Sequence, residues 1–100
     1  MGKLRYSIKA VEDLSSIWSY TVETWSEKQA DTYYSMLISS CELIATDPLH
    51  VGRNYEHIVP YLRGYKVGKH IIFYMLKDDA VLIVRILHEQ MDLRSRLSGE

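Results

Sequence analysis

Cysteine is nearly absent from this chain of 100 residues, where Cys41 is the only one. A single thiol cannot form an intrachain disulfide, and its place on an apolar helical face is typical of a small buried hydrophobe rather than a nucleophile. The sequence also lacks CxxC and HExxH spacings, and its four histidines are scattered over loops and strands. We therefore expect no metal site and no cofactor.

Long apolar runs are missing too, and no basic leader followed by an apolar stretch opens the chain. The lone cysteine favours a reducing compartment. We expect a soluble cytoplasmic protein that makes no contact with a membrane. No internal repeat or low-complexity segment is present, so the length predicts a single domain over residues 1–100 with a modest core.

Neither sign of charge dominates the chain, but the charges are unevenly distributed. Residues 10–48 hold seven acidic and one basic side chain, a net charge of −6, whereas the remaining segments carry a net charge of +5. An acidic helical part would repel nucleic acid, and a basic part would attract phosphate or an acidic peptide. The alternative is that these charges simply lie on solvated faces.

Hydrophobic periodicity predicts two helices followed by three strands. One helical face runs from Leu14 to Trp25, and Ser26 with Gln29 forms a capping box that begins a second helix, which Asp47-Pro48 ends. The other expected elements are a short strand at 5–9, a loop at 49–60, strands at 61–67, 70–77 and 80–88 with turns at 68–69 and 78–79, and a last short helix capped by Asp92 and reaching Leu97.

These elements predict an α+β fold: a strand, an antiparallel helical hairpin and a three-stranded antiparallel meander, with a short C-terminal tail. Each helix has one apolar stripe, so both stripes should cover the sheet. The pairing of the first strand stays open. The expected core between helices and sheet consists of Trp18, Trp25, Leu37, Ile38, Phe73 and Ile83.

An arginine inside the apolar segment 81–88 is the most informative feature of the chain. A buried guanidinium needs a partner, so Arg85 should meet a carboxylate, a carbonyl or an open groove. His88 lies where the strand should end. Regular alternation would place Arg85 on a face with Val81, Ile83 and Leu87, and His88 on the other with Leu82, Val84 and Ile86.

Basic residues interleaved with tyrosines in the second half of the chain suit a surface that grips phosphates. An RNA-cleaving site needs a general base, an acid and a fixed cation. Glu56, His88 and either Arg63 or Arg85 could fill those roles. The alternative, which we favour, is that they are solvated strand positions and a strand-terminal histidine.

The order of several short motifs resembles the ParE branch of the RelE/ParE toxin superfamily over nearly the whole chain. The motifs are Tyr6, Ala10, Asp13-Leu14, Trp18-Ser19-Tyr20-Thr21, Trp25-Ser26, Phe73-Tyr74 and Arg85-Ile86-Leu87-His88-x-x-Met91-Asp92. RNA-cleaving relatives usually carry an arginine just after the histidine of the third strand. This chain has Ile71 there, a departure that fits the ParE branch.

The resemblance implies the toxin of a type II toxin–antitoxin pair that binds DNA gyrase and traps its cleaved-DNA complex. It would not be an enzyme. Its partner would be a ParD-like antitoxin with a segment that folds on the toxin surface, and operator DNA would be reached only through that antitoxin. The alternative is a ribosome-dependent mRNA endoribonuclease of the RelE type.

Two sets of site residues follow from this interpretation. Antitoxin-binding cations are expected at Arg63, Lys66 and Arg85, because they lie in the basic part of the chain. In the ParE family the C-terminal region is implicated in activity, so target binding is expected at His88, Met91, Asp92, Arg94 and Arg96. No residue is expected to be catalytic.

Overall fold

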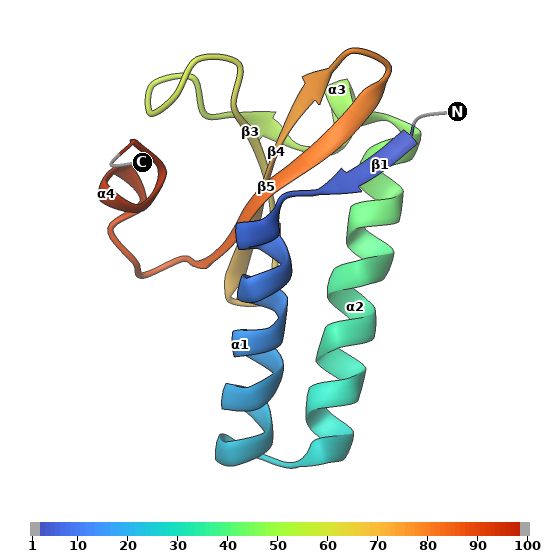
Figure 1. Cartoon of the computed structure of the whole chain (residues 1–100), viewed down its shortest axis with the longest axis vertical. Helices are drawn as coiled ribbons and strands as arrows, with labels where there is room; N and C mark the ends of the chain where they lie inside the picture. The colour runs from blue at the N-terminus through green and yellow to red at the C-terminus, as the bar shows by residue number, and fades with distance from the viewer. Residues whose placement is uncertain (1–2, 99–100) are drawn as a thin grey trace.

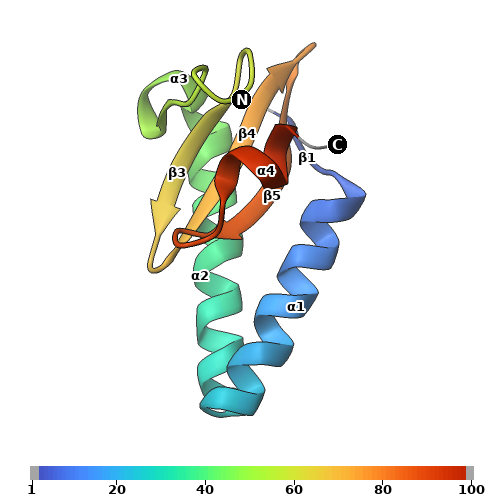
Figure 2. The same ribbon diagram turned by 90° about the vertical axis from the view of Figure 1, so that its left-hand side faces the viewer.

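The sheet carries a long helical hairpin on one face and a short helix on the other (Figure 1, and Figure 2 from the side). The computed structural model describes residues 3–98. In chain order the elements are β1 (Lys3–Tyr6), α1 (Ile8–Thr24), α2 (Glu27–Thr46), α3 (Pro48–Val51), β2 (Arg53–Asn54), β3 (Arg63–Val67), β4 (His70–Lys77), β5 (Ala80–His88) and α4 (Leu93–Ser98). The predicted α+β class and order of main elements are confirmed.

The five strands lie in the order β1-β5-β4-β3-β2. Strands β3, β4 and β5 form the predicted antiparallel meander, with tight turns at Gly68-Lys69 and Asp78-Asp79. The sheet as a whole is mixed, because β1 pairs with β5 in parallel and places Lys3 opposite Ala80. The N-terminal strand therefore forms one edge of a sheet whose other strands come from the second half of the chain.

Several of the expected boundaries are wrong. The strand expected at 61–67 begins at Arg63, because Tyr61 adopts a positive φ of 66° in the preceding turn. The first strand ends at Tyr6 rather than Lys9, because the Ser7 hydroxyl accepts a hydrogen bond from the Ala10 amide at 3.0 Å and so begins α1. The same hydroxyl donates to the Val84 carbonyl at 2.7 Å, which fixes the helix to β5. The expected loop at 49–60 contains the end of α3 and the two-residue strand β2.

The second helix follows its prediction closely. The Ser26 hydroxyl accepts from the Gln29 amide at 3.1 Å, and the helix ends one residue before Asp47-Pro48. Its buried residues fall on one stripe, Ala30, Leu37, Cys41, Ile44 and Ala45, and all of these except Ala30 belong to the core cluster between hairpin and sheet. Helix α2 therefore supplies much of the core between the helical hairpin and the sheet.

The core is divided by the sheet into two clusters. Leu37 and Ile83 are buried between hairpin and sheet as predicted, with Ile38 packed against them, but Phe73 is buried on the opposite face. There it packs with Leu62 and with residues of the 55–62 loop and α4. Two tryptophans predicted in the core lie outside it. Trp25 is 71% exposed, and Trp18 is half-buried between α1 and α2, outside both clusters. Trp25 directly follows the last residue of α1, and Figure 1 shows that the hairpin extends beyond the sheet at this end.

A β-bulge changes the face of Arg85. Phe73 pairs with Arg85 and Tyr74 pairs with Ile83, so Val84 has no partner across the ladder. The predicted alternation is therefore wrong past this point: Ile83 and Ile86 lie in the cluster on the helical side, and Leu87 lies in the other. Arg85 consequently does not share a face with Ile83.

Candidate functional site

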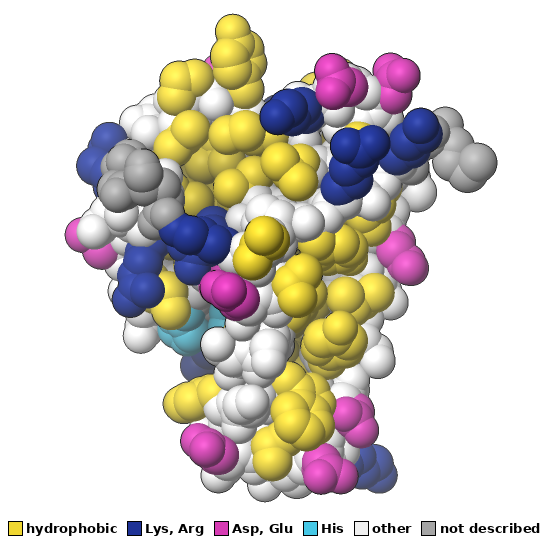
Figure 3. Space-filling view, viewed as in Figure 1, with side chains coloured by type: hydrophobic (Ala, Val, Ile, Leu, Met, Phe, Trp, Pro, Cys, Tyr) yellow, Lys and Arg dark blue, Asp and Glu magenta, His cyan; other side chains and the backbone are white. Residues whose placement is uncertain are grey.

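An apolar groove lies between α1 and α2, on the face that Figure 3 presents to the viewer. This helical groove has a volume of about 580 Å³ and is lined by Tyr6, Val11, Leu14, Ser15, Trp18, Asp31, Tyr34 and Ile38. Val11 is 54% and Tyr34 40% exposed, so apolar area faces solvent there. The Trp18 indole donates to the Asp31 carboxylate at 3.0 Å and ties the two helices together. Such a groove suits an amphipathic segment of a partner.

Tyr6 and Cys41 lie next to each other beneath this groove. Burial raises the pKa of the Cys41 thiol to about 11, and it raises the pKa of the Tyr6 hydroxyl still further above its ordinary value. Both groups are therefore neutral near pH 7. Cys41 is fully buried, as the sequence predicted for a small core residue.

Arg63, a predicted antitoxin contact, turns its guanidinium toward its own chain. Its Nε donates to the Pro48 carbonyl at 3.0 Å, and its Nη2 donates to the carbonyls of Leu49 and Gly52 at 2.9 and 2.8 Å. The buried Tyr74 hydroxyl donates to the same Pro48 carbonyl at 2.6 Å. Arg63 thus fixes the chain between α2 and β3, and little of its charge is directed toward solvent.

The other two predicted antitoxin cations are also paired. Arg85 Nε and Nη2 donate to the two carboxylate oxygens of Asp13 at 2.8 and 2.9 Å, with both side chains only 14% exposed. Hydrogen bonding to Asp13 raises the pKa of Arg85. Lys66 lies 2.9 Å from the Glu89 carboxylate, and that contact lowers the pKa of Glu89. Lys66 is the most accessible of the three, with 59% of its side chain exposed.

His88 faces His70 at the end of the sheet, with ring centroids 5.3 Å apart. His70 Nδ1 lies 2.6 Å from the Tyr33 hydroxyl of α2. Burial, followed by the neighbouring His88, lowers the pKa of His70 to about 4. A second apolar groove of about 420 Å³ adjoins the pair and is lined by Ser16, Ile17, Tyr20, His70, His88, Gln90 and Met91.

The C-terminal tail packs against the sheet face opposite the hairpin. Asp92 caps α4 as predicted, since its carboxylate accepts from the Ser95 amide at 3.3 Å. Leu93 and Leu97 pack against the second core cluster, and Arg94 donates to the His57 carbonyl at 3.3 Å. Met91 is 38% exposed, and Arg96 borders a small hollow beside the start of α1. These predicted target-binding residues therefore spread from the second groove to α4.

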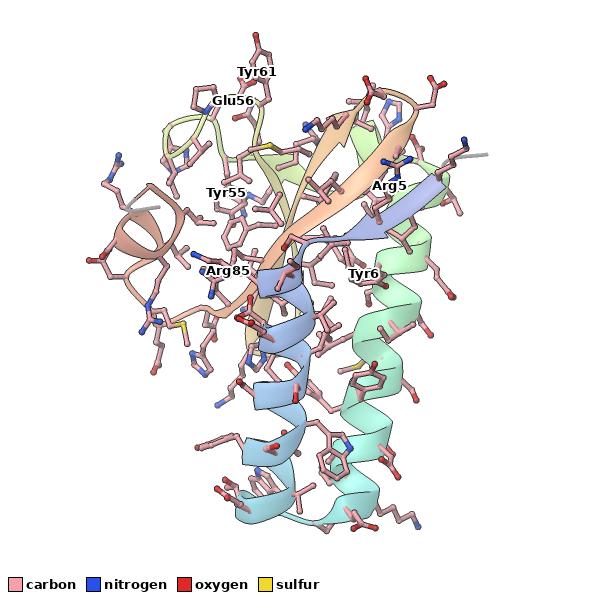
Figure 4. The ribbon with its side chains drawn as sticks, viewed as in Figure 1. Arg5, Tyr6, Tyr55, Glu56, Tyr61 and Arg85 are labelled. Carbon is pink, nitrogen blue, oxygen red and sulfur yellow. The ribbon has the colours of Figure 1, made fainter. Side chains whose placement is uncertain are left out.

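The residues proposed for RNA cleavage do not converge. Glu56 lies in the 55–62 loop, where it accepts from the Asn54 side chain at 3.1 Å, whereas Arg85 lies near the start of α1 (Figure 4). Within residues 3–98 no three histidine, cysteine or acidic side chains are grouped to hold a metal ion. Over the same residues, no helix combines the length and apolar character needed to cross a membrane.

Sequence reasoning missed two features that the structure brings out. The helical groove combines residues of β1, α1 and α2, and only the pairing of β1 with β5 places Tyr6 there. Tyr61 lies exposed on the 55–62 loop with φ of 66°, a conformation that no sequence pattern indicated. The Pro60 that precedes it was the available signal of a tight turn.

Comparison with known proteins gives a consistent result. The family model described as the ParE toxin of the type II toxin–antitoxin system parDE matches residues 4–93. Toxin ParE1 of Caulobacter vibrioides is 34% identical over 97 residues, covering 97% of this chain and 99% of that protein. Toxin ParE1 of Mycobacterium tuberculosis is 32% identical over 85 residues, covering 84% and 86%.

Solved structures share the fold. The chromosomal ParDE toxin–antitoxin system of P. aeruginosa superposes with a TM-score of 0.79 at 21% identity, over 88% of this chain and 96% of that one. The RelBE2 complex of M. tuberculosis gives 0.66 at 17% identity, over 87% and 96%. With a family model over most of its length and relatives about one-third identical, the chain belongs to the ParE toxin family of type II toxin–antitoxin systems.

Proposed function

We propose that this toxin stops growth by binding DNA gyrase and trapping the cleaved-DNA complex, without catalysing a reaction itself. One observation carries the second part: the cations that a nuclease would use are already bound within the chain. Arg63 donates to three backbone carbonyls, and Arg85 is held by both oxygens of Asp13. Neither cation is directed toward a phosphate in a cleft.

The choice of gyrase rests on membership in the ParE family, because its members resemble RNA-cleaving toxins yet act on this enzyme. The position after His70 supports it, since Ile71 is buried in the sheet where the nucleases carry an arginine. A gyrase poison needs a surface that binds gyrase, and it does not need a general acid, a general base and a cation placed together in one site. The exposed apolar grooves and loop of this chain supply such surfaces.

We further propose that a ParD-like antitoxin neutralises the toxin by placing an apolar segment in the helical groove. The groove offers exposed Val11 and Tyr34 beside the Trp18–Asp31 hydrogen bond. A segment that folds on binding would lay one apolar stripe between α1 and α2. Acidic side chains on the antitoxin would contact Lys66 at the sheet. The toxin would bind operator DNA only indirectly, through the antitoxin.

Two assays with purified toxin test the target. Gyrase supercoiling should be blocked with accumulation of cleaved DNA, and mRNA on translating ribosomes should stay intact. Cleavage of ribosome-bound mRNA with unaffected supercoiling would contradict the proposal and favour the RelE-type alternative.

A matched pair of variants on α2 tests the antitoxin groove. Tyr34→Asp places a charge in the groove and should weaken antitoxin binding by about tenfold or more while toxicity persists. Met36→Asp, with a side chain 41% exposed but outside the groove lining, should bind antitoxin normally. Equal binding by both variants would mean that the antitoxin lies elsewhere.

A further inference from the structure

Tyr61 combines wide exposure with a backbone conformation that tyrosine rarely adopts. Its side chain is 77% exposed, and its φ is 66°. Among residues 3–98 the other non-glycine residue with positive φ is Asp78, at 57°, in the β4–β5 turn. Aspartate is tolerated there, but a bulky aromatic in the left-handed region is a real outlier.

The loop that carries Tyr61 is held firmly in place. The Tyr55 amide donates to the Leu62 carbonyl at 2.9 Å, and the Leu62 amide donates to the Val59 carbonyl at 3.2 Å. Leu62 is fully buried, and the Tyr55 ring packs edge-on against Phe73 with centroids 5.1 Å apart. The left-handed residue lets the chain bury Leu62 while the Tyr61 side chain points away from the body of the protein (Figure 4).

The fold itself gives little reason for a tyrosine at this position. Glycine adopts positive φ without strain, and a ring that is 77% exposed buries little area of its own. Strained conformations of this kind persist only where the surrounding structure enforces them, and they cluster at functional sites. A rigid loop also presents its aromatic side chain at low entropic cost to a partner.

The chemistry of the loop favours a protein partner over nucleic acid. Residues 55–62 themselves contain no lysine or arginine, carry one carboxylate, Glu56, and are otherwise mostly apolar or aromatic. The two cations beside the loop already contact it: Arg53 lies over the Tyr55 ring at 5.9 Å, and Arg94 donates to the His57 carbonyl. Nucleic acid binding depends on cations near phosphates, whereas an exposed tyrosine is among the residues that dominate protein interfaces. The loop also lies apart from Tyr6 and the helical groove (Figure 4).

We propose that Tyr61 is the anchor by which the toxin engages its target protein, with its ring inserted in an apolar pocket of that protein. The identity of the target rests on the proposed function; the contact itself does not. Helix α4 acts as a support for this loop, because Arg94 bonds to the His57 carbonyl and Leu93 packs in the same cluster as Val59. The loop and the antitoxin groove are then separate surfaces.

The experiment compares Tyr61→Gly with Asp78→Gly. Glycine adopts a positive φ without strain, although it adds freedom to the unfolded chain, so both variants should melt close to the wild-type temperature. Tyr61→Gly should nonetheless lose growth arrest in cells and raise the concentration needed to inhibit gyrase by about tenfold or more. Its affinity for antitoxin should be unchanged. Asp78→Gly should remain fully toxic, and Tyr61→Phe should keep most of the toxicity.

The outcomes separate this inference from the proposed function. Full toxicity of Tyr61→Gly would overturn the anchor. A parallel loss of antitoxin affinity would identify the antitoxin as the occupant, and Tyr61-dependent binding of a single-stranded oligonucleotide would identify a nucleic acid; either result would overturn the target-protein assignment. If growth arrest depends on Tyr61 while wild-type toxin leaves gyrase unaffected, the anchor stands and gyrase is the wrong target.

Discussion

Asp13 neutralises Arg85 from a position 72 residues earlier in the chain. The same carboxylate accepts from the Ile86 amide at 2.9 Å, beside the bulge in β5. Asp13→Ala should lower the free energy of unfolding by about 1–3 kcal/mol, because it leaves the partly buried Arg85 guanidinium without its carboxylate partner. Urea unfolding measures the loss, and Glu23→Ala on the exposed face of α1 is the control, with an effect below about 0.5 kcal/mol.

A double variant checks the same pair in another way. Combining Asp13→Ala with Arg85→Leu should cost less than the sum of the two single variants, since removing both charges leaves no buried ion. Simple additivity would show that the ion pair is already solvated in the folded protein.

His70 should make stability depend on pH. Its pKa is about 4 in the folded protein, and burial is the main cause, whereas an unfolded histidine titrates near about 6.5. Between these values the unfolded chain binds the proton first, so the free energy of unfolding falls as the pH drops from about 6.5 to about 4.

The expected loss over that window is on the order of 1 kcal/mol, because the ring is only partly buried and solvent screens its charge. Denaturant unfolding at successive pH values measures it. His70→Asn should flatten the slope in this window, whereas His57→Asn, in the exposed loop, should leave it in place. An unchanged slope in His70→Asn would assign the pH dependence to other groups.

For single residues, the sequence predicts what kind of contact a side chain makes better than it predicts which residue it contacts. A lone arginine in an apolar strand demanded a carboxylate or carbonyl, and the structure supplies one. Nothing local points to Asp13, because the contact depends on how α1 crosses the sheet. The prediction for Trp25 fails for a related reason: α1 ends at Thr24, beyond the sheet, so that Trp25 follows the helix and is exposed.

Helix α2 carries the clearest packing prediction among the elements. Leu37 is fully buried on its stripe, so Leu37→Ala should lower the free energy of unfolding by about 2–5 kcal/mol through lost transfer energy and a residual cavity. Met36→Ala, at an exposed neighbouring position, should cost less than about 0.5 kcal/mol. Equal costs measured by chemical denaturation would mean that the stripe is assigned wrongly.

Helix α4 combines packing with a proposed role in target binding. Truncation after Asp92 removes Leu93 and Leu97 from the second core cluster and should lower stability by about 2–3 kcal/mol, at about 1–1.5 for each partly buried leucine. The truncated protein should stay folded, still bind antitoxin and lose gyrase inhibition. A combined Arg94→Ala and Arg96→Ala variant keeps the leucines. If it inhibits gyrase as well as wild type, the tail acts only by packing.

The elements that the sequence predicts well are those set by neighbouring residues. The turns at 68–69 and 78–79 define the β3–β4–β5 meander locally, and Ser26 marks the start of α2. The bulge at Val84 and the parallel pairing of β1 depend on contacts between distant segments. Their signals in the sequence are therefore weak. The bulge decides on which face of the sheet Arg85 lies, and the pairing of β1 places Tyr6 in the helical groove.

Across the whole molecule, the acidic excess belongs to the hairpin and the basic excess to the rest of the chain. Arg63 is committed to its own backbone, so Lys66 is the better position at which to test electrostatic attraction of the antitoxin. Lys66→Glu should slow association at low salt and weaken its salt dependence. Lys28→Glu, the same charge change at the far end of the hairpin, is the control, and stopped-flow mixing is the measurement. Equal association rates for wild type and both variants would mean that electrostatic attraction at Lys66 does not contribute to antitoxin binding.

The parallel pairing of β1 with β5 sets a time order during synthesis. Residues 3–6 leave the ribosome early, but their partners are residues 80–83. At about 5–20 residues per second, translation separates the two strands by roughly 4–16 s. Tyr6 can line the helical groove only after that interval, because β1 has no ladder to join before β5 exists. A partly made chain therefore has no complete groove, and an antitoxin that binds in the groove, as proposed, would meet its full binding surface only after β5 has been made.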